Sequence, residues 1–187
     1  KLHGIANGSS NGINIDYFNM TQFSQDQLDK LKTELNIIAT DFVFIFVGRL
    51  VADKGINELV KAFIKISETN KNSKLLLVGP FEDDLDPLEK STLEAIKSNS
   101  SIISVGYQND VRPYFAISNT LVFPSYREGF GTSIIEGSLV ELPIICSDTY
   151  GLKDTILNDV TGFRHKVKDV DSIFEQTEVD ITLFVSV

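Results

Sequence analysis

Short apolar runs alternate with helical patterns from about residue 43 onward. The runs are rich in Val, Ile, Leu and Phe, as strands buried on both faces are, and they span residues 43–47, 74–78, 101–105, 120–123 and 144–147. Apolar residues at helical spacing lie before and between these runs, at residues 24–35, 56–67, 88–97, 110–117 and 133–141. This alternation predicts an α/β fold built on a doubly wound parallel sheet with helices on both faces.

Two segments lie outside this alternation. Residues 1–20 contain the turn-rich stretch Asn7-Gly8-Ser9-Ser10-Asn11-Gly12, which is typical of a linker. We therefore expect an inter-domain linker at residues 1–20 and a single domain at residues 21–187. Residues 178–187 are mostly apolar and carry no stop signal, so we expect them to form an exposed tail at a truncated or altered end.

Composition narrows the classes of function. The chain has 187 residues, of which 42% are hydrophobic, enough to bury the core of one domain. Its formal net charge of −9 repels nucleic-acid phosphates, and its Lys and Arg residues form no stripe, so we expect no nucleic-acid partner. No apolar run approaches the roughly 18 residues that a membrane span needs. We therefore expect a soluble, cytoplasmic domain.

Side chains that bind metals are few and isolated. The single cysteine, Cys146, lies within an apolar run and is predicted to be a buried strand thiol. His3 and His165 have no ligand-type neighbours, and we expect both in solvated loops. The acidic residues within 83–86 are expected to form a solvated turn. The sequence therefore predicts no metal site.

The strongest candidate site is a glycine-rich loop that runs into a helix. It comprises Tyr126-Arg127-Glu128-Gly129-Phe130-Gly131-Thr132-Ser133-Ile134-Ile135-Glu136. Gly129 and Gly131 let the backbone approach a ligand, and the amides near Thr132 lie at a helix start, where anions such as phosphate bind. Glu128 and Glu136 are spaced so that they can contact different parts of one extended ligand. The motif alone leaves open a solvated glutamate beside a helix that needs glycine to pack.

A second cluster places two cations after the first predicted strand. Arg49 and Lys54 lie in the same loop and can hold a diphosphate through charge-assisted hydrogen bonds. In doubly wound sheets the ligand crevice lies outside the carboxyl ends of the strands, where strand order reverses. Gly106 and Tyr107 follow the third predicted strand and face the same region. The alternative is an ordinary basic turn in which Asp53 neutralises one neighbour.

Together these motifs resemble one family. Their order is similar to that in the C-terminal domain of family 4 glycosyltransferases, of the group 1 glycosyl transferase type, which are retaining enzymes of the GT-B fold. The resemblance extends over residues 7–163, and its most specific mark is two glutamates with seven residues between them. The matching motifs are Gly48-Arg49-Leu50, Lys54-Gly55, Val105-Gly106, Asp110-Val111, Pro124-Ser125, Glu128-Gly129-Phe130-Gly131 and Glu136. The resemblance implies a Rossmann-like donor-binding domain that lacks the N-terminal acceptor domain.

The resemblance also implies a role for each matching residue. Arg49 and Lys54 match positions that bind the donor diphosphate and stabilise it as the leaving group. Glu128 matches the glutamate beside the donor sugar, and these three are the expected catalytic residues. Glu136 matches the glutamate that accepts hydrogen bonds from the ribose hydroxyls. The other expected donor contacts are Gly129, Phe130, Gly131, Thr132, Gly106 and Tyr107.

The reaction implied by the resemblance is transfer of a hexose from a UDP-, GDP- or ADP-sugar to an acceptor with retention of anomeric configuration. No metal and no further cofactor are expected. The resemblance also implies a bacterial enzyme of surface polysaccharide or lipopolysaccharide biosynthesis, with a lipid-linked acceptor at the membrane. The isolated donor-binding half is not expected to turn over.

Three other functions stay open. A dinucleotide-binding domain for NAD would use Gly129 and Gly131 with Asp148 beyond the next strand, although Ile134 stands where that fingerprint has glycine or alanine. A GT-B sugar-nucleotide epimerase would share the donor site but needs carboxylates placed for proton transfer. A non-catalytic module would bind the nucleotide alone.

Overall fold

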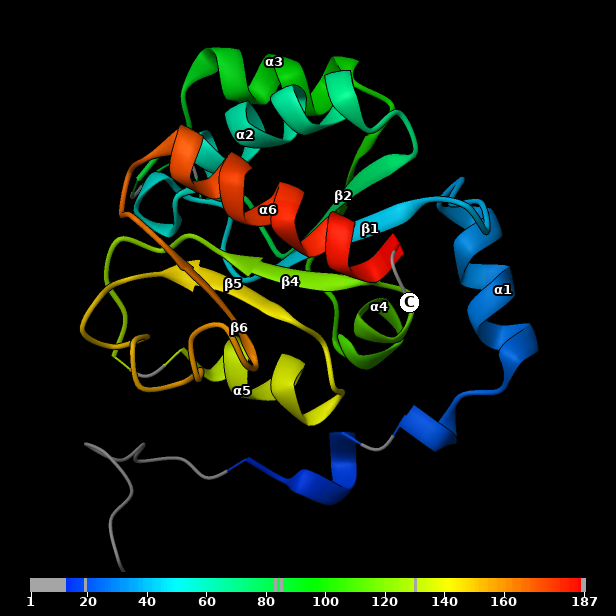
Figure 1. Ribbon diagram of the computed structural model, residues 1–187. Helices are drawn as coiled ribbons and strands as arrows, with labels where there is room; N and C mark the ends of the chain where they lie inside the picture. The colour runs from blue at the N-terminus through cyan, green and yellow to red at the C-terminus, as the bar shows by residue number, and fades with distance from the viewer. Residues whose placement is uncertain (1–12, 19, 83, 85, 130, 186–187) are drawn as a thin grey trace, which may run out of the picture.

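The computed structural model describes residues 13–18, 20–82, 84, 86–129 and 131–185, with side chains described through residue 182. Its centre is a parallel sheet in the order β3-β2-β1-β4-β5-β6. The strands are β1 (Phe42–Val47), β2 (Ser73–Val78), β3 (Ile102–Gly106), β4 (Thr120–Phe123), β5 (Ile144–Ser147) and β6 (Gly162–His165). Figure 1 shows helices on both faces of this sheet, so the predicted doubly wound α/β fold is confirmed.

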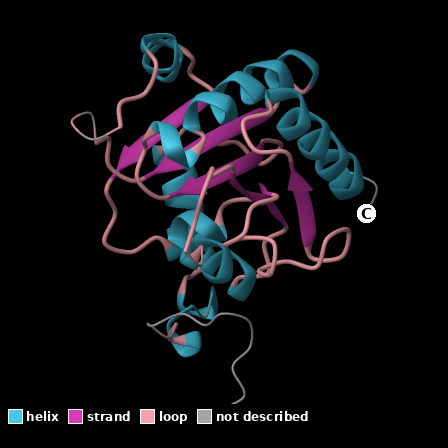
Figure 2. Ribbon diagram, turned by 90° about the vertical axis from the view of Figure 1, so that its left-hand side faces the viewer, coloured by secondary structure: helices cyan, strands magenta, loops and turns pink. Residues whose placement is uncertain are grey.

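The helices form two layers, and Figure 2 shows the sheet between them. One layer holds α2 (Ile56–Thr69), α3 (Lys90–Ser98) and α6 (Val170–Val185), and the other holds α4 (Arg112–Ala116) and α5 (Thr132–Leu139). The remaining helical elements are α1 (Gln25–Glu34) and three short 3-10 helices, η1 (Ile15–Phe18), η2 (Met20–Gln22) and η3 (Ala52–Lys54). Each predicted helix is present, with ends shifted by a few residues.

The central strands are apolar on both faces because both faces are covered. Phe44, Ile45 and Phe46 of β1 are fully buried, and so is most of β2. The chain builds β1, β2 and β3 outward in one direction and then returns, so that β4 pairs with the other side of β1. The strand order therefore reverses between β1 and β4, which places the expected ligand crevice at their carboxyl ends.

The C-terminal end of the chain differs from the sequence-based prediction. Residues 178–182, expected in an exposed tail, belong to α6, which packs against α2 and against the sheet. Thr177 is fully buried, and Asp180 and Ile181 are 6% and 9% exposed. Asp180 accepts a hydrogen bond from the Thr120 hydroxyl at the start of β4. The prediction was wrong because two polar residues interrupt the apolar stripe of α6, and both are buried with hydrogen bonds.

One histidine was also placed wrongly. His165, expected in a solvated loop, lies on β6 and is only 2% exposed. Its Nδ1 lies 2.8 Å from the Lys166 carbonyl oxygen, and burial lowers the pKa of the imidazole. The strand β6 itself was not predicted. Cys146 is fully buried in β5, as expected, whereas His3 lies outside the described residues.

Candidate functional site

The loops that follow β1, β4 and β5 interlock at the point where strand order reverses. Two glycines make this contact possible because a side chain at either position would collide with backbone. A Cβ at Gly55 would lie 2.2 Å from the Pro124 carbonyl oxygen, and one at Gly151 would lie 1.8 Å from that of Glu128. The Tyr126 amide also donates to the Asp53 carbonyl over 2.8 Å. These contacts hold the ends of β1 and β4 together.

Lys54 and Glu128 form an ion pair across this reversal point. Lys54 ends η3, after β1, and Glu128 lies in the loop after β4. Each side chain is 15% exposed, so the pair is largely shielded from solvent. The structure thus brings together two of the three residues expected to be catalytic.

Arg49 is paired with a different carboxylate. Its guanidinium lies 2.7 Å from a carboxylate oxygen of Glu82, in the loop after β2, and its side chain is 48% exposed. The hydrogen bond with Glu82 raises the pKa of Arg49, so the guanidinium stays charged. In the same loop, Asp86 accepts a hydrogen bond from the Asp53 amide, so this part of the expected solvated turn has a structural role.

The glycine-rich loop leads into α5 as predicted. Gly131 caps the helix with φ of 57°, a left-handed conformation that favours glycine. Apart from its two chain neighbours, a Cβ at Gly129 would meet nothing within 4 Å. The Ile134 amide already donates to the Gly131 carbonyl over 2.9 Å, so the anion donors of the helix start lie nearer Thr132. Phe130 lies outside the described residues.

Glu136 lines a separate cavity of about 380 Å³. Its carboxyl is half-buried, and burial raises its pKa because the charged form loses hydration. Thr132 lines the same cavity, one turn earlier on α5. The other lining residues come from the loop before α4 and from the N-terminal end of the described chain, and they are Asn109, Val111, Ile13, Asn14, Tyr17 and Phe18.

The loop after β3 contains two residues that were expected to contact the donor, Gly106 and Tyr107. Gly106 ends β3, and Tyr107 is 70% exposed. Neither of them lines the Glu136 cavity, whereas Asn109 and Val111 of the same loop do. The expected donor contacts of Gly106 and Tyr107 therefore stay a prediction, and this cavity adds Asn109 and Val111 of the same loop as candidates.

Two residues that support the site were not singled out from the sequence. Gly151 lets the loop after β5 pack on Glu128, and Tyr126 ties the site to α2. The Tyr126 hydroxyl donates to Glu58 over 2.7 Å, and burial, followed by that hydrogen bond, raises the pKa of the phenol. The available signal was position, since both residues follow strands at the carboxyl edge of the sheet.

The arrangement suits an extended anionic ligand. Cations, a helix start and open backbone lie at the reversal point, and a carboxylate faces the neighbouring cavity. Within the described parts of the chain, no group of three or more His, Cys, Asp or Glu side chains is placed to hold a metal ion. None of the described helices is both long and apolar enough to cross a bilayer.

Comparisons with known proteins identify the family of the chain. Residues 28–178 match the family model described as glycosyl transferases group 1. The capsular polysaccharide biosynthesis glycosyltransferase CapM of Staphylococcus aureus is 34% identical over 181 residues, which cover 95% of this chain and 45% of CapM.

Two solved structures share the fold. Anabaena HepE in complex with UDP superposes with a TM-score of 0.79 at 21% identity over 92% of this chain and 46% of HepE. The C-terminal domain of the group 1 family protein LpcC from Francisella tularensis superposes with a TM-score of 0.76 at 21% identity, over 91% of this chain and 88% of that domain. The chain therefore spans less than half the length of CapM and HepE and matches a single domain of LpcC. It belongs to the group 1 glycosyl transferases.

Proposed function

We propose that this chain is the donor-binding half of a retaining hexosyltransferase that uses a nucleotide-diphosphate-sugar. The observation that carries the proposal is the Lys54–Glu128 ion pair at the strand reversal, next to a helix whose Glu136 lines a cavity of its own. Family membership supports it, and so does the HepE complex, in which a protein of similar fold binds UDP.

The proposed roles follow from charge and position. Lys54 and Arg49 bind the diphosphate, which replaces the carboxylates that neutralise them in this structure. Negative charge grows on the diphosphate as it leaves the sugar, and fixed cations with the helix-start amides stabilise it without reorganising. Glu128, freed from Lys54, lies beside the sugar. Backbone groups of Gly129, Phe130 and Gly131 complete the contacts of sugar and phosphate.

Glu136 is proposed to bind the ribose. A half-buried carboxylate without enough hydrogen-bond donors is costly, and the raised pKa of Glu136 reflects that cost. Two adjacent ribose hydroxyls would donate to the carboxylate and favour its charged form. The cavity beside Glu136 then holds the nucleoside, while the reversal point holds the diphosphate and the sugar.

The wider setting of the reaction is also a proposal. The donor is a UDP-, GDP- or ADP-sugar, with no metal or other cofactor, and the acceptor binds an N-terminal domain that precedes a linker at residues 1–20. CapM is named for capsular polysaccharide biosynthesis, and a 26% identical Salmonella typhimurium relative is named as a lipopolysaccharide 1,2-N-acetylglucosaminetransferase. By analogy, this chain works on surface polysaccharide at the cytoplasmic side of the membrane, with a lipid-linked acceptor.

Calorimetric titration of the chain with UDP, GDP, ADP and NAD tests the proposal. We expect one nucleoside diphosphate to bind, and Arg49→Ala and Glu136→Ala each to weaken it about tenfold, because each removes a charged hydrogen-bonding partner. Lys61→Ala is the matched control, since it also removes a half-exposed cation that pairs with a carboxylate, Glu89, and Lys61 is not among the expected site residues. Binding of NAD alone would instead support a dinucleotide-binding domain and contradict the proposal.

A further inference from the structure

Arg112 joins the N-terminal end of the described chain to the α/β body. This first residue of α4 is 9% exposed, and its guanidinium makes two hydrogen bonds to Asp110, from Nε over 2.8 Å and from Nη2 over 2.7 Å. Its Nη1 donates to the Tyr17 carbonyl over 2.7 Å and to the Gln22 side chain over 2.9 Å. Asp110 thus fixes the guanidinium, which in turn holds a distant segment of the chain.

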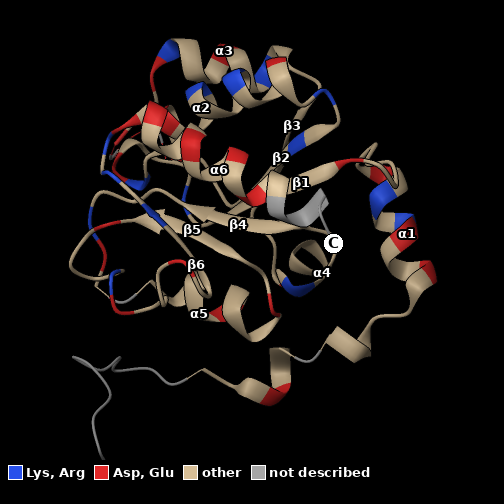
Figure 3. Cartoon of the chain, viewed as in Figure 1, with Lys and Arg blue, Asp and Glu red and all other residues tan. Residues whose placement is uncertain are grey.

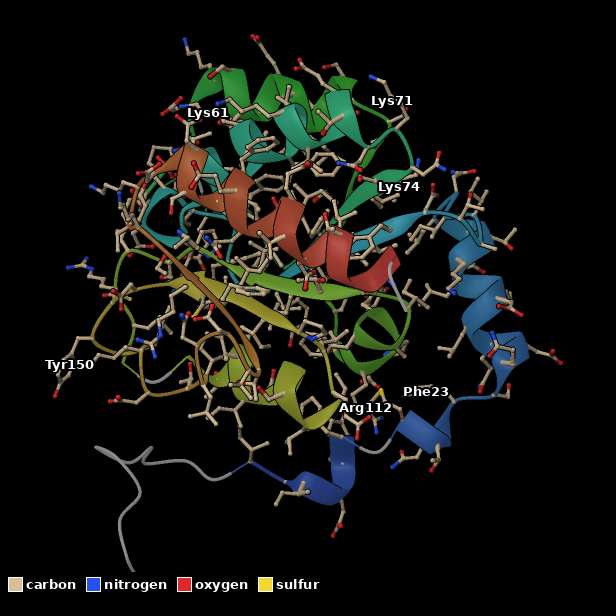
Figure 4. All side chains as sticks on the ribbon, in the orientation of Figure 1. Phe23, Lys61, Lys71, Lys74, Arg112 and Tyr150 are labelled. Atoms are coloured by element: carbon tan, nitrogen blue, oxygen red, sulfur yellow. The ribbon has the colours of Figure 1, made fainter. Side chains whose placement is uncertain are left out.

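Two aromatic rings reinforce this attachment. The guanidinium carbon of Arg112 lies 3.7 Å from the centre of the Tyr17 ring and 5.2 Å from that of Phe23. Figure 4 shows Arg112 and Phe23 side by side below the sheet. Residues 13–18 and 20–23, which we call the N-terminal strap, are therefore bound at both 3-10 helices, η1 and η2.

The strap forms one wall of the Glu136 cavity. Ile13, Asn14, Tyr17 and Phe18 line it from the strap side, and the α/β body supplies the opposite wall. The two walls together offer aromatic and aliphatic surface, side-chain amides and a carboxylate. This mixture suits a nucleoside, whose base has apolar faces and a polar edge and whose ribose donates hydrogen bonds. The cavity of about 380 Å³ is within the usual range for small-molecule sites, about 300–1,000 Å³.

The structure assigns the N-terminal strap to the nucleoside pocket, and it assigns Arg112 to positioning that wall. Arg112 does not line the cavity, so it acts through Tyr17 and Gln22 and not by touching the ligand. The strap's 3-10 helices are too short to be stable without tertiary contacts, and their own bonds are local, such as that from the Tyr17 amide to Asn14. Loss of Arg112 therefore opens the pocket on one side. This inference rests on the proposed function, because it concerns the same donor site.

Calorimetry with two kinds of ligand separates the strap from the diphosphate site. Inorganic pyrophosphate tests only the region of Arg49 and Lys54, whereas UDP, GDP and ADP also test the nucleoside pocket. We expect Arg112→Ala to lower the affinity for the nucleoside diphosphate about tenfold and to narrow the differences in affinity among UDP, GDP and ADP. The affinity for pyrophosphate should change less than about twofold. The nucleotide affinity of Arg112→Lys should lie between those of the unsubstituted chain and Arg112→Ala, since lysine keeps the charge but cannot make the two parallel hydrogen bonds of a guanidinium.

Further variants keep the test decisive. Ile13→Ala trims the wall without touching Arg112 and should reproduce part of the loss, so the inference can be tested even if Arg112→Ala fails to fold. Lys61→Ala should change the affinity for neither the nucleoside diphosphate nor pyrophosphate. Unchanged nucleotide affinity, or an equal loss for pyrophosphate, would overturn the role of the strap and leave the proposed function standing. Failure of the unaltered chain to bind any nucleoside diphosphate would overturn both.

Discussion

Paired polar side chains are partly exposed at the carboxyl end of the sheet and buried at its amino end. At the carboxyl ends of β1 and β4, Lys54 and Arg49 are paired with carboxylates that stay partly open to solvent. At the amino end of β4, Thr120 is bonded to Asp180 of α6, and both residues are almost completely buried between the strand and the helix. Figure 3 shows that charged residues lie mainly on loops and on the outer faces of helices, while most of the sheet carries none.

This difference separates exchangeable from fixed interactions. A half-exposed ion pair such as Arg49–Glu82 contributes little to stability, so a ligand can replace one partner at small cost. A buried hydrogen-bonded pair cannot change partners unless the helix that carries one of them moves away from the sheet. Substitutions at the amino end should therefore alter stability, and charge substitutions at the carboxyl end should alter binding. Substitutions at Asp180 and Glu82 test this difference between the two ends. A substitution at Gly55 tests the one exception, a position at the carboxyl end that is expected to affect stability.

The largest effect on stability is expected at Gly55. At this position the loops after β1 and β4 are held together by close backbone contact and not by charged side chains. Gly55→Ala places a Cβ against the Pro124 carbonyl and should lower the free energy of unfolding by about 3 kcal/mol or more. Gly106→Ala is a matched control, because Gly106 has nearly the same φ, 69° against 72°, with nothing within 4 Å of the added Cβ. It should cost about 1–2 kcal/mol, the cost of the left-handed conformation alone. Equal losses in urea unfolding would show that the contact between the loops is unimportant.

A smaller effect of opposite sign is expected at Asp180. Burial raises its pKa, so the folded state binds this proton more tightly than the unfolded state does. Its contribution to stability is complete below the ordinary aspartate pKa and is lost as pH rises through the raised value. Asp180→Asn should therefore raise the free energy of unfolding at pH 7 by about 1 kcal/mol and reduce its change between pH 4 and pH 7.

The control for that substitution lies on the same helix. Asp171→Asn changes an aspartate whose side chain is 73% exposed and paired with Lys65, so urea unfolding should detect almost no change. A loss of stability in Asp180→Asn at pH 7 would mean that the charged carboxylate is the form that holds α6 in place.

The smallest effect on stability is expected at Glu82. Glu82→Gln weakens the half-exposed ion pair with Arg49 and should change the free energy of unfolding by less than about 0.5 kcal/mol. It should also raise the affinity for a nucleoside diphosphate by about twofold, because Arg49 is then easier for the ligand to recruit. Calorimetry and urea unfolding on one sample measure both. A gain in affinity without a loss of stability would confirm that this interaction is exchangeable, and a fall in affinity would show that Glu82 instead positions Arg49 for the ligand.

The core of the fold was predictable because its signals are local. Strands such as β1 and β2 are apolar on both faces, and Gly131 marks the start of α5 in the sequence itself. β6 and α6 were missed because their burial depends on distant partners. Thr177 and Asp180 read as polar residues in the sequence, and only the contact with Thr120 explains why Asp180 is buried.

The same limit applies to the candidate site. The sequence identified Lys54 and Glu128 as members of two clusters, but their contact follows from the pairing of β1 with β4, which strand patterns do not reveal. The partner of Arg49 was not foreseen because Glu82 belongs to no motif. Residues 1–20 carried only turn signals, so the docking of residues 13–18 at the Glu136 cavity was also not foreseen.

The rate at which the single thiol in β5 reacts with a labelling reagent can report how often the structure around it opens. Cys146 is fully buried, and burial raises its pKa to about 12, so it is unreactive while the sheet is closed. An alkylating reagent can reach it only after the elements that cover this face of β5 move away. Because the chain has no second cysteine, each mass increment counts one such opening. Slower labelling in the presence of a nucleotide would therefore detect binding of that nucleotide to the unsubstituted protein.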